Sequence, residues 1–246
     1  MSAIATANRS ASSGLNDNDY TLSLAGENAF ILYLQPQLIS PAVAERIALA
    51  THQLTPMLGQ QLIELLPSYA SLLIVFDPLQ HSHLSIKPIL QQTLAKPVNL
   101  LSQSQAKLVE LPVWYSEKSG ADLTAVARAK NLTVAEVIAL HSATHYQVYA
   151  IGFAPGFAYL GELPEQLAMP RLSSPRAKVP AGAVAIADRQ TAVYPAASPG
   201  GWHLLGLCPI PMFNAKREPP MPVAVGDQVR FAPITAREYQ LLGGDL

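Results

Sequence analysis

Residues 152–160 read Gly-Phe-Ala-Pro-Gly-Phe-Ala-Tyr-Leu, and they stand where the chain changes from mixed helix and strand signals to short apolar strands. Glycine permits positive φ and close backbone approach, whereas proline fixes φ and has no amide hydrogen to donate. Two glycines and one proline in so short a stretch predict a rigid loop of unusual conformation. Its aromatic residues, Phe153, Phe157 and Tyr159, either plug the core at a barrel corner or form the wall of a ligand site.

Short apolar segments separated by Gly- and Pro-rich connections surround this loop and follow it. We predict strands at 146–151, 183–187, 191–194, 203–207 and 228–232. This spacing is typical of a closed or nearly closed β-barrel. Ahead of the loop the pattern predicts a strand at 107–114 and helices at 121–129 and 133–141. Thr133 and Glu136 have the spacing of a capping box, which marks the start of the second helix.

The first part of the chain alternates short strands with helical segments. We predict strands at 20–25, 29–34, 61–66 and 70–76, and helices at 41–56 and 83–95. Ser40 is the expected N-cap of the first helix, with Pro41 at its first position. The short connection between the third and fourth strands favours a hairpin. Together these elements predict a small α+β sandwich of the split βαβ type.

The chain therefore has the predicted fold class α+β, a small N-terminal α/β sandwich followed by a β-barrel. Residues 1–19 are rich in Ser, Ala and Asn and predict a disordered tail, and residues 99–106 lie in a stretch that loses periodicity and predicts a linker. The two domains are expected at 20–98 and 107–246.

The composition narrows the classes of function. Only 13% of residues are charged, about half of the roughly 25% usual in soluble domains. Either Gln and Ser replace charges on the surface, or a partner protein covers much of it. A net charge of −1 with scattered basic residues argues against nucleic-acid binding. The apolar runs are too short to span a membrane, and we expect a soluble, cytoplasmic chain without a signal peptide.

Cysteine and histidine positions argue against a disulfide framework and a metal site. Cys208 is the only cysteine, and we expect it to be a small buried hydrophobe in a reducing compartment. His141 and His145 are spaced for one helix face, but His145 should fall beyond the helix and neither that pair nor His81 and His83 has an evident third ligand. The sequence predicts no metal site.

Two further blocks carry chemistry. Arg171 and Arg176 each follow a proline, so their guanidinium groups sit beside fixed turns and suit a carboxylate or a phosphate, although either can close a surface salt bridge instead. Gly200 and Gly201 can form an anion-binding nest or simply make a turn. No GxxxxGK[ST] or GxGxxG phosphate-binding motif occurs, so ATP, if it is used, is held elsewhere or by an atypical surface.

The order of these blocks resembles the allophanate hydrolase subunit 1 family, which includes the B subunits of 5-oxoprolinases and kinase-inhibitor-like proteins. The matching segments are Gly152–Leu160, Leu163–Leu167, Pro170-Arg171, Pro175-Arg176, Val179–Val184, Gln190–Pro195 and Ser198–Trp202. The chain departs from the family pattern at Ser116–Gly120, Ala183, Asp188, Ala192 and Leu207-Cys208. At Asp188 and Ala192 the family usually has glycine.

The resemblance implies a cyclophilin-like barrel and a role as one subunit of an ATP-dependent 5-oxoprolinase, which hydrolyses 5-oxo-L-proline to L-glutamate. It implies an allophanate hydrolase subunit 2-type partner and a LamB/YcsF-type subunit, with ATP used by the complex. Two alternatives stay open: a regulatory inhibitor of a sensor histidine kinase, or the carboxyltransferase half of a urea-carboxylase-like enzyme. No catalytic base is identified. The expected substrate-binding residues are Phe157, Tyr159, Arg171, Arg176, Gln190, Tyr194, Gly200 and Gly201.

Overall fold

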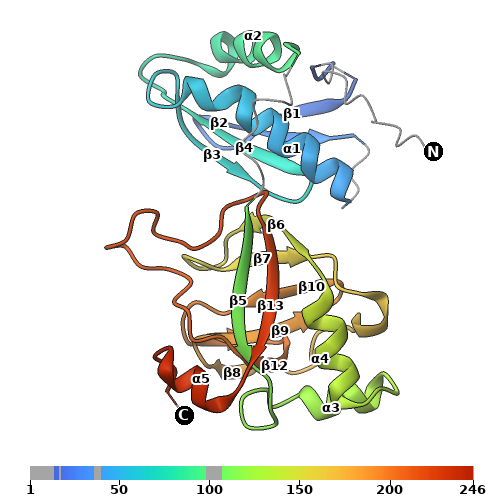
Figure 1. The fold of residues 1–246 in the computed structure, drawn as a ribbon. Coiled ribbons are helices and arrows are strands. Elements are labelled where there is room, and N and C mark those ends of the chain that lie inside the picture. Colours follow the sequence, from blue (N-terminus) through green and yellow to red (C-terminus); the bar gives the residue numbers. More distant parts are fainter. Residues whose placement is uncertain (1–13, 17, 36–39, 98–106, 246) are drawn as a thin grey trace, which may run out of the picture. The chain divides into compact units, whose positions relative to one another are not determined.

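The computed structural model describes the backbone of residues 14–16, 18–35, 40–97 and 107–245. The chain divides into two compact units, residues 1–105 and 106–246 (Figure 1). The predicted linker at 99–106 and most of the predicted tail at 1–19 lie outside the described residues. Among the described helices, none is long and apolar enough to cross a bilayer.

The first unit is an antiparallel sheet with the strand order β1-β2-β4-β3. Its elements are β1 (Tyr20–Leu24), β2 (Ala29–Leu34), α1 (Pro41–Leu54), the short 3-10 turn Thr55–Met57, β3 (Leu62–Pro67), β4 (Ser71–Phe76) and α2 (His83–Leu94). Because β4 lies between β2 and β3, the run β2–α1–β3 is a split βαβ unit, as the sequence predicted. Both helices bury their apolar side chains in the same core as β2 and β4, so they cover one face of the sheet.

Ordered structure begins before Tyr20, within the region predicted as a tail. Leu15 is only 8% exposed, and its amide donates to the carbonyl oxygen of Leu94 at 2.8 Å. Asp19 forms an ion pair with Arg46 of α1, with Oδ1 and Nη2 3.1 Å apart. These contacts join the described part of the N-terminal segment to both helices.

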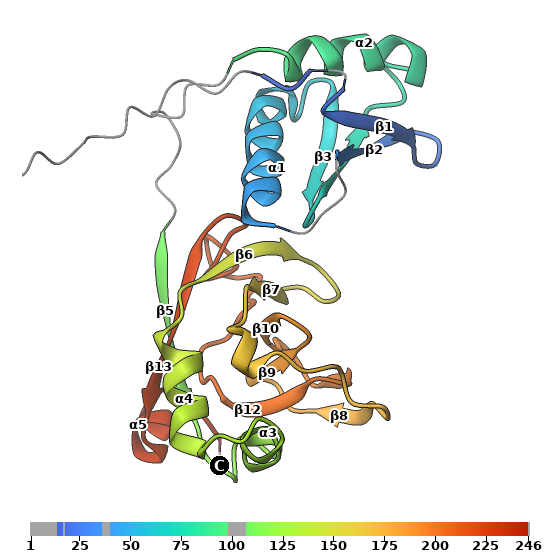
Figure 2. The ribbon, with the colours of Figure 1, turned by 90° about the vertical axis from the view of Figure 1, so that its right-hand side faces the viewer.

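The second unit is built on a closed barrel with the strand order β10-β7-β6-β13-β5-β12-β9, which confirms the predicted barrel. Its strands are β5 (Leu108–Trp114), β6 (Tyr146–Ile151), β7 (Ala158–Gly161), β9 (Ala183–Ala187), β10 (Gln190–Val193), β12 (His203–Leu207) and β13 (Gln228–Ile234). A separate two-stranded sheet pairs β8 (Arg176–Val179) with β11 (Ser198–Gly200). Figure 2 shows β8 outside the wall formed by β9 and β12.

Short helices complete the barrel unit. They are α3 (Leu123–Ala129), α4 (Val134–Ala143), the 3-10 turn Glu165–Leu167 and α5 (Ala236–Leu241). The α4 helix packs against β13 and lies beside α3 (Figure 1). The side chain of Thr133 accepts from the amide of Glu136, and the Glu136 carboxylate accepts from the Thr133 amide, which confirms the predicted capping box.

Alternate residues of the barrel strands point inward, and they form the interior cluster. Strand residues of this cluster are Leu111, Val113, Tyr146, Val148, Ala158, Leu160, Val184, Ile186, Val193, Leu205, Val229 and Phe231. Each barrel strand contributes, and α3 and α4 add further apolar side chains. Cys208 also packs here, and burial raises the pKa of its thiol to about 12, in agreement with the predicted buried hydrophobe.

His141 is a core residue rather than a metal ligand. Tyr115 Oη lies 2.7 Å from His141 Nδ1, and Thr191 Oγ1 lies 2.9 Å from His141 Nε2. Because Thr191 donates its hydroxyl hydrogen to the Ala185 carbonyl oxygen, it accepts from Nε2–H, and Nδ1 accepts from Tyr115. Burial lowers the pKa of His141 to about 3, so the ring is neutral. Within the described ranges, no group of three His, Cys, Asp or Glu side chains could hold a metal ion.

Candidate functional site

The opposite, outward face of β7, β9, β10 and β12 carries a second buried cluster, which we call the outer cluster. Along β9 and β10 four of the outward residues are small, namely Ala183, Ala185, Ala187 and Ala192, and all four are 0% exposed. Successive strand residues point to opposite faces, so these alanines alternate with the interior valines and isoleucine. The small side chains leave room for large rings. Those rings are Phe157, Tyr159, Tyr194 and Trp202.

Phe157 is the centre of the outer cluster. Its ring centroid lies 4.8 Å from that of Tyr159, 5.2 Å from that of Tyr194 and 5.7 Å from that of Trp202. All three contacts are edge-to-face, the arrangement that aromatic quadrupoles favour. Phe157 and Tyr194 are 2% exposed, whereas Tyr159 is partly exposed. Of the predicted site residues, Phe157 therefore holds the other rings in place rather than facing solvent.

The loop before β7 has the unusual conformation that its sequence predicts. Gly156 has φ +88°, and a Cβ there would lie 2.7 Å from the Met212 carbonyl oxygen, so no larger residue fits. Phe153 has φ +71°, which costs an L-residue about 1–2 kcal/mol. Its ring packs edge-on against Phe157, with centroids 5.2 Å apart, but remains 65% exposed. Phe153 was not among the predicted site residues.

Arg171 lies over the outer cluster. Its guanidinium carbon is 5.8 Å from the centroid of the Trp202 ring, within cation–π range. The Arg171 Nε is 3.7 Å from Asp188 Oδ2, and both side chains are about 60% exposed, so this ion pair is loose. Asp188 has φ +53°, a left-handed conformation that explains why the family favours glycine at this position.

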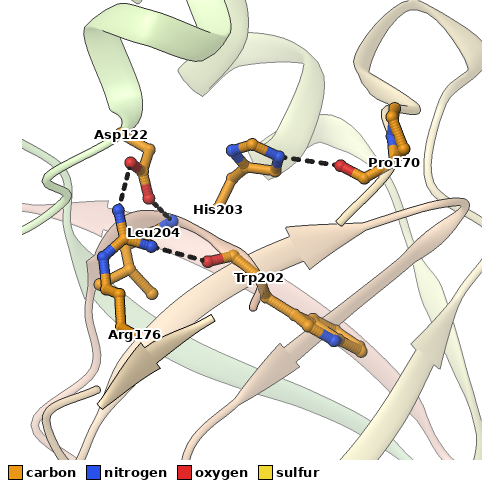
Figure 3. A network of polar contacts seen from close by, with 6 residues as sticks. All are labelled: Asp122, Pro170, Arg176, Trp202, His203 and Leu204. Atoms are coloured by element: carbon orange, nitrogen blue, oxygen red, sulfur yellow. Dashed lines mark hydrogen bonds and ion pairs between the residues drawn. The ribbon is translucent and has the colours of Figure 1, made fainter. Parts of the chain in front are cut away.

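Arg176, at the start of β8, is tied into a polar network that Figure 3 shows. Its Nη2 donates to Asp122 Oδ1 at 2.5 Å, and its Nη1 donates to the Trp202 carbonyl oxygen at 3.2 Å. Asp122 Oδ2 accepts from the amide of Leu204 at 2.7 Å. The Asp122 side chain is 11% exposed and that of Arg176 is 27% exposed, so the ion pair is largely desolvated. These contacts use two of the five N–H donors that a guanidinium carries.

The Tyr194 hydroxyl lies against β11, at the residue that pairs with Arg176. Burial raises the pKa of Tyr194, while the charges of Arg171 and Arg176 act in the opposite direction. A Cβ added to Gly200 would lie 2.4 Å from Tyr194 Oη, so the backbone of Gly200 passes directly over this hydroxyl. The hydroxyl thus lies against a bare stretch of backbone, and the charges of both arginines act on it.

The two adjacent glycines, for which a nest and a turn were both considered, have an ordinary backbone conformation. Gly200 ends β11, which pairs with β8, and neither Gly200 nor Gly201 has positive φ. Glycine is needed at residue 200 because of the Tyr194 hydroxyl rather than because of backbone strain. The amide of Leu172 donates to the Gly201 carbonyl oxygen at 2.7 Å, which joins the segment that carries Arg171 to the same place.

Most of the predicted site residues are therefore neighbours. The outward position of Gln190 on β10 puts it on the same face, but it lies at the far end of the strand from Tyr194, opposite Ala187. Sequence reasoning missed Asp122, Phe153 and Trp202. Chemically, two arginines in contact with Trp202 suit a small anion beside apolar rings.

The comparison with protein-family models finds a match over residues 20–223 to the carboxyltransferase domain, subdomain C and D. That range contains most of the chain, including every residue of the outer cluster and its arginines.

The chain belongs to the carboxyltransferase domain family. A member from Bacillus subtilis (strain 168), named as the B subunit of 5-oxoprolinase, is 38% identical over 187 residues, which cover 72% of this chain and 78% of the relative. A member from Escherichia coli O157:H7 with the same name is 37% identical over 210 residues, 85% of this chain and 94% of the relative. The resemblance to this type of 5-oxoprolinase subunit is thus confirmed.

The solved structure of the protein TTHA0988 shares the fold of this carboxyltransferase domain chain. Its TM-score is 0.74 at 35% sequence identity, and the match covers 85% of this chain. The same match covers only 40% of the TTHA0988 chain, so this chain spans less than half of that protein.

Proposed function

We propose that this chain is the B-type subunit of an ATP-dependent 5-oxoprolinase. The subunit acts on 5-oxo-L-proline, which the complex opens to L-glutamate, and it is inactive alone. The names of the Bacillus subtilis and Escherichia coli relatives support this assignment. The observation that carries it is the placement of two arginines against Trp202 of the outer cluster, Arg171 over its ring and Arg176 on its carbonyl oxygen, because 5-oxo-L-proline presents a carboxylate beside a small ring.

The substrate carboxylate binds beside Tyr194 in this proposal. Arg176 is held by Asp122 and by the Trp202 carbonyl oxygen, yet keeps further N–H donors, and Arg171 is held only by its loose contacts. A guanidinium fixed in orientation loses little entropy when it binds a carboxylate. The remaining proposed site residues are Phe157, Tyr159, Gln190, Gly200 and Gly201. Phe157 and Gly200 shape the site, whereas Tyr159 and Gln190 line it.

The other steps belong to partner subunits. The chain has no phosphate-binding loop motif, so we assign ATP binding and phosphoryl activation to the other members of a cytoplasmic complex. Those members are an allophanate hydrolase subunit 2-type protein and a LamB/YcsF-type subunit. We assign no general base to these groups, because burial raises the pKa of Tyr194 and the two guanidinium groups carry hydrogen-bond donors but no acceptor.

The test is ATP-dependent glutamate release by the reconstituted three-subunit mixture. We expect Arg176→Lys to raise KM for 5-oxo-L-proline about tenfold to a hundredfold, because the planar fork is lost while the charge remains. Tyr194→Phe should raise KM about tenfold through loss of the hydroxyl. Arg230→Lys is the matched control, because Arg230 pairs with Glu110 at an exposed position on β13. Full activity of both site variants in a mixture that requires this subunit contradicts the assignment.

The second candidate function is the carboxyltransferase half of a urea-carboxylase-like enzyme. The description of the matching family model favours it. A biotin carboxylase gene beside this one, with transfer of a carboxyl group from biotin, would support that function. A LamB/YcsF-type gene in the same place supports the oxoprolinase. The third alternative, inhibition of a sensor histidine kinase, predicts neither neighbour.

A further inference from the structure

Phe153 combines two features that folding does not explain. Its backbone adopts φ +71°, where a bulky residue is a genuine outlier, and its ring is 65% exposed. Glycine would adopt the same backbone conformation without strain. Within the described part of the chain, the ring contact of Phe153 is the edge-on packing against Phe157. Little burial therefore offsets the strain, and strained residues of this kind concentrate at functional sites.

The loop presents the Phe153 ring rigidly. The amide of Gly152 donates to the Phe157 carbonyl oxygen at 3.0 Å, and the amide of Phe157 donates to the Ala154 carbonyl oxygen at 2.9 Å. Gly156 sits against the backbone of Met212 and the Cβ of Phe213. These contacts fix the ring before any ligand arrives, so little conformational entropy is lost on binding.

Phe213 is a second exposed aromatic residue next to this loop. It is 40% exposed, and its Cβ would lie 2.8 Å from a Cβ at Gly156, so the two loops are in contact. Phe157 links Phe153 to the outer cluster, since its ring centroid lies 5.2 Å from that of Phe153 and 5.7 Å from that of Trp202.

We propose that Phe153 and Phe213 form an anchor for a second protein subunit, the one that completes the site at Tyr194. This inference rests on the proposed function, in which the chain acts only within a complex. The partner is the allophanate hydrolase subunit 2-type protein, and it presents an apolar pocket to the Phe153 ring.

Three observations favour a protein partner. Aromatic residues that are exposed, rigid and central to a contact supply most of the binding energy at protein interfaces. The 13% of charged residues is low for a surface that faces only water. In TTHA0988 the matched region is 40% of a longer chain, so in that protein further chain is covalently attached to this unit.

The experiment measures both binding and folding. The purified allophanate hydrolase subunit 2-type protein from the same organism is immobilised, and the full chain is the analyte. We expect Phe153→Gly to weaken binding about 30-fold. The same variant should leave Tm unchanged or raise it by about 2 °C, because the strain is removed. Phe153→Ala keeps the strain and should also weaken binding, and Phe213→Ala should weaken it about tenfold. Leu241→Ala, at a position 76% exposed on α5, is the matched control.

The outcomes separate this inference from the proposed function. Absence of binding by the wild-type chain contradicts the proposed partnership itself. Wild-type affinity in Phe153→Gly, with the wild-type chain binding normally, overturns the anchor and leaves the partnership in place. A fall of several degrees in the Tm of Phe153→Gly shows a folding role and also overturns it. Weaker binding by Phe153→Gly and Phe153→Ala, with unchanged binding by Leu241→Ala, supports the anchor.

Discussion

The interior cluster and the outer cluster lie on opposite faces of the same strands and solve different problems. Inside, the buried polar groups are neutral and mutually hydrogen-bonded, as the contacts of His141 with Tyr115 and Thr191 show. Outside, small alanine side chains pack against the aromatic rings of the outer cluster. Next to them lie charged arginines and a loop with a strained backbone. Because side chains alternate along β9 and β10, neighbouring residues of one strand belong to different environments.

This difference shows how one sheet serves stability and function together. In the interior the groups are well packed and their hydrogen bonds are satisfied, so removing any of them lowers the free energy of unfolding. The outer face has charged, strained and partly exposed residues, which contribute little to that free energy. Substitutions inside should therefore change mainly the free energy of unfolding. Substitutions at the arginines outside should change mainly binding.

The largest effect should follow from His141→Ala. The change opens a cavity beside Phe231, whose ring stacks on the imidazole with centroids 4.6 Å apart, and it leaves Tyr115 and Thr191 without their partner. We expect the free energy of unfolding to fall by about 4 kcal/mol, measured by urea denaturation. If the free energy of unfolding falls by less than about 1 kcal/mol, the interior cluster does not depend on close packing around His141.

The next effect concerns pH and the same residue. The folded-state pKa of His141 is about 3, below the value of about 6.5 expected in the unfolded chain. Below about pH 6.5 the unfolded state therefore binds a proton that the folded state does not, and stability falls as pH decreases towards about 3. Between about pH 7 and about pH 5 this should cost about 2 kcal/mol. His141→Gln should lack this component, so equal pH slopes for the two proteins would contradict the assignment.

A smaller effect should follow from Gly200→Ala on the outer face. The added methyl group would lie 2.4 Å from Tyr194 Oη, so the hydroxyl must move. We expect a loss of about 2 kcal/mol in the free energy of unfolding. Removing the hydroxyl with Tyr194→Phe should recover about 1 kcal/mol of that loss in a double-mutant cycle. Strict additivity of the two changes would show that the hydroxyl is not the obstacle.

The smallest effect on stability should follow from Arg171→Gln. The Arg171 side chain is 59% exposed, and its ion pair with Asp188 is loose, so we expect unfolding to change by no more than about 0.5 kcal/mol. The same variant should raise KM for 5-oxo-L-proline about tenfold in the reconstituted mixture. A stability loss of several kcal/mol would show that Arg171 contributes to folding as the interior residues do, and would contradict its assignment to binding.

Most of the fold could be predicted because its elements carry strong local signals. Every strand and both long helices of the first unit lie within about two residues of their predicted bounds, since apolar periodicity and caps such as Ser40 mark them. The strands β7, β8 and β11 were missed. They are short, and β11 contains Pro199 and Gly200. An alternation of apolar and polar residues therefore cannot be recognised over so few positions. The α5 helix was also missed, although Thr235 and Glu238 form a capping box.

The site was harder to predict because its interactions join distant segments. Arg171, Arg176 and Tyr194 were predicted from their local motifs, and their role in substrate binding stays a prediction. In the structure both arginines contact Trp202. The ion pair between Arg176 and Asp122 spans 54 residues of sequence, and no local pattern reveals it. Phe153 was noticed as part of a rigid loop, but exposure and positive φ are properties of the folded chain alone.

The pairing that closes the barrel has a consequence for synthesis of the chain. β5 and β13 run parallel along their full lengths, and their facing residues Glu110 and Arg230 are 120 residues apart. A ribosome adds about 5–20 residues per second, so β13 is synthesised on the order of ten seconds after β5. An unpaired strand edge invites wrong partners, and Pro112 within β5 removes one amide donor from that edge. Pro112 thus reduces the tendency of β5 to aggregate while the rest of the barrel is being synthesised.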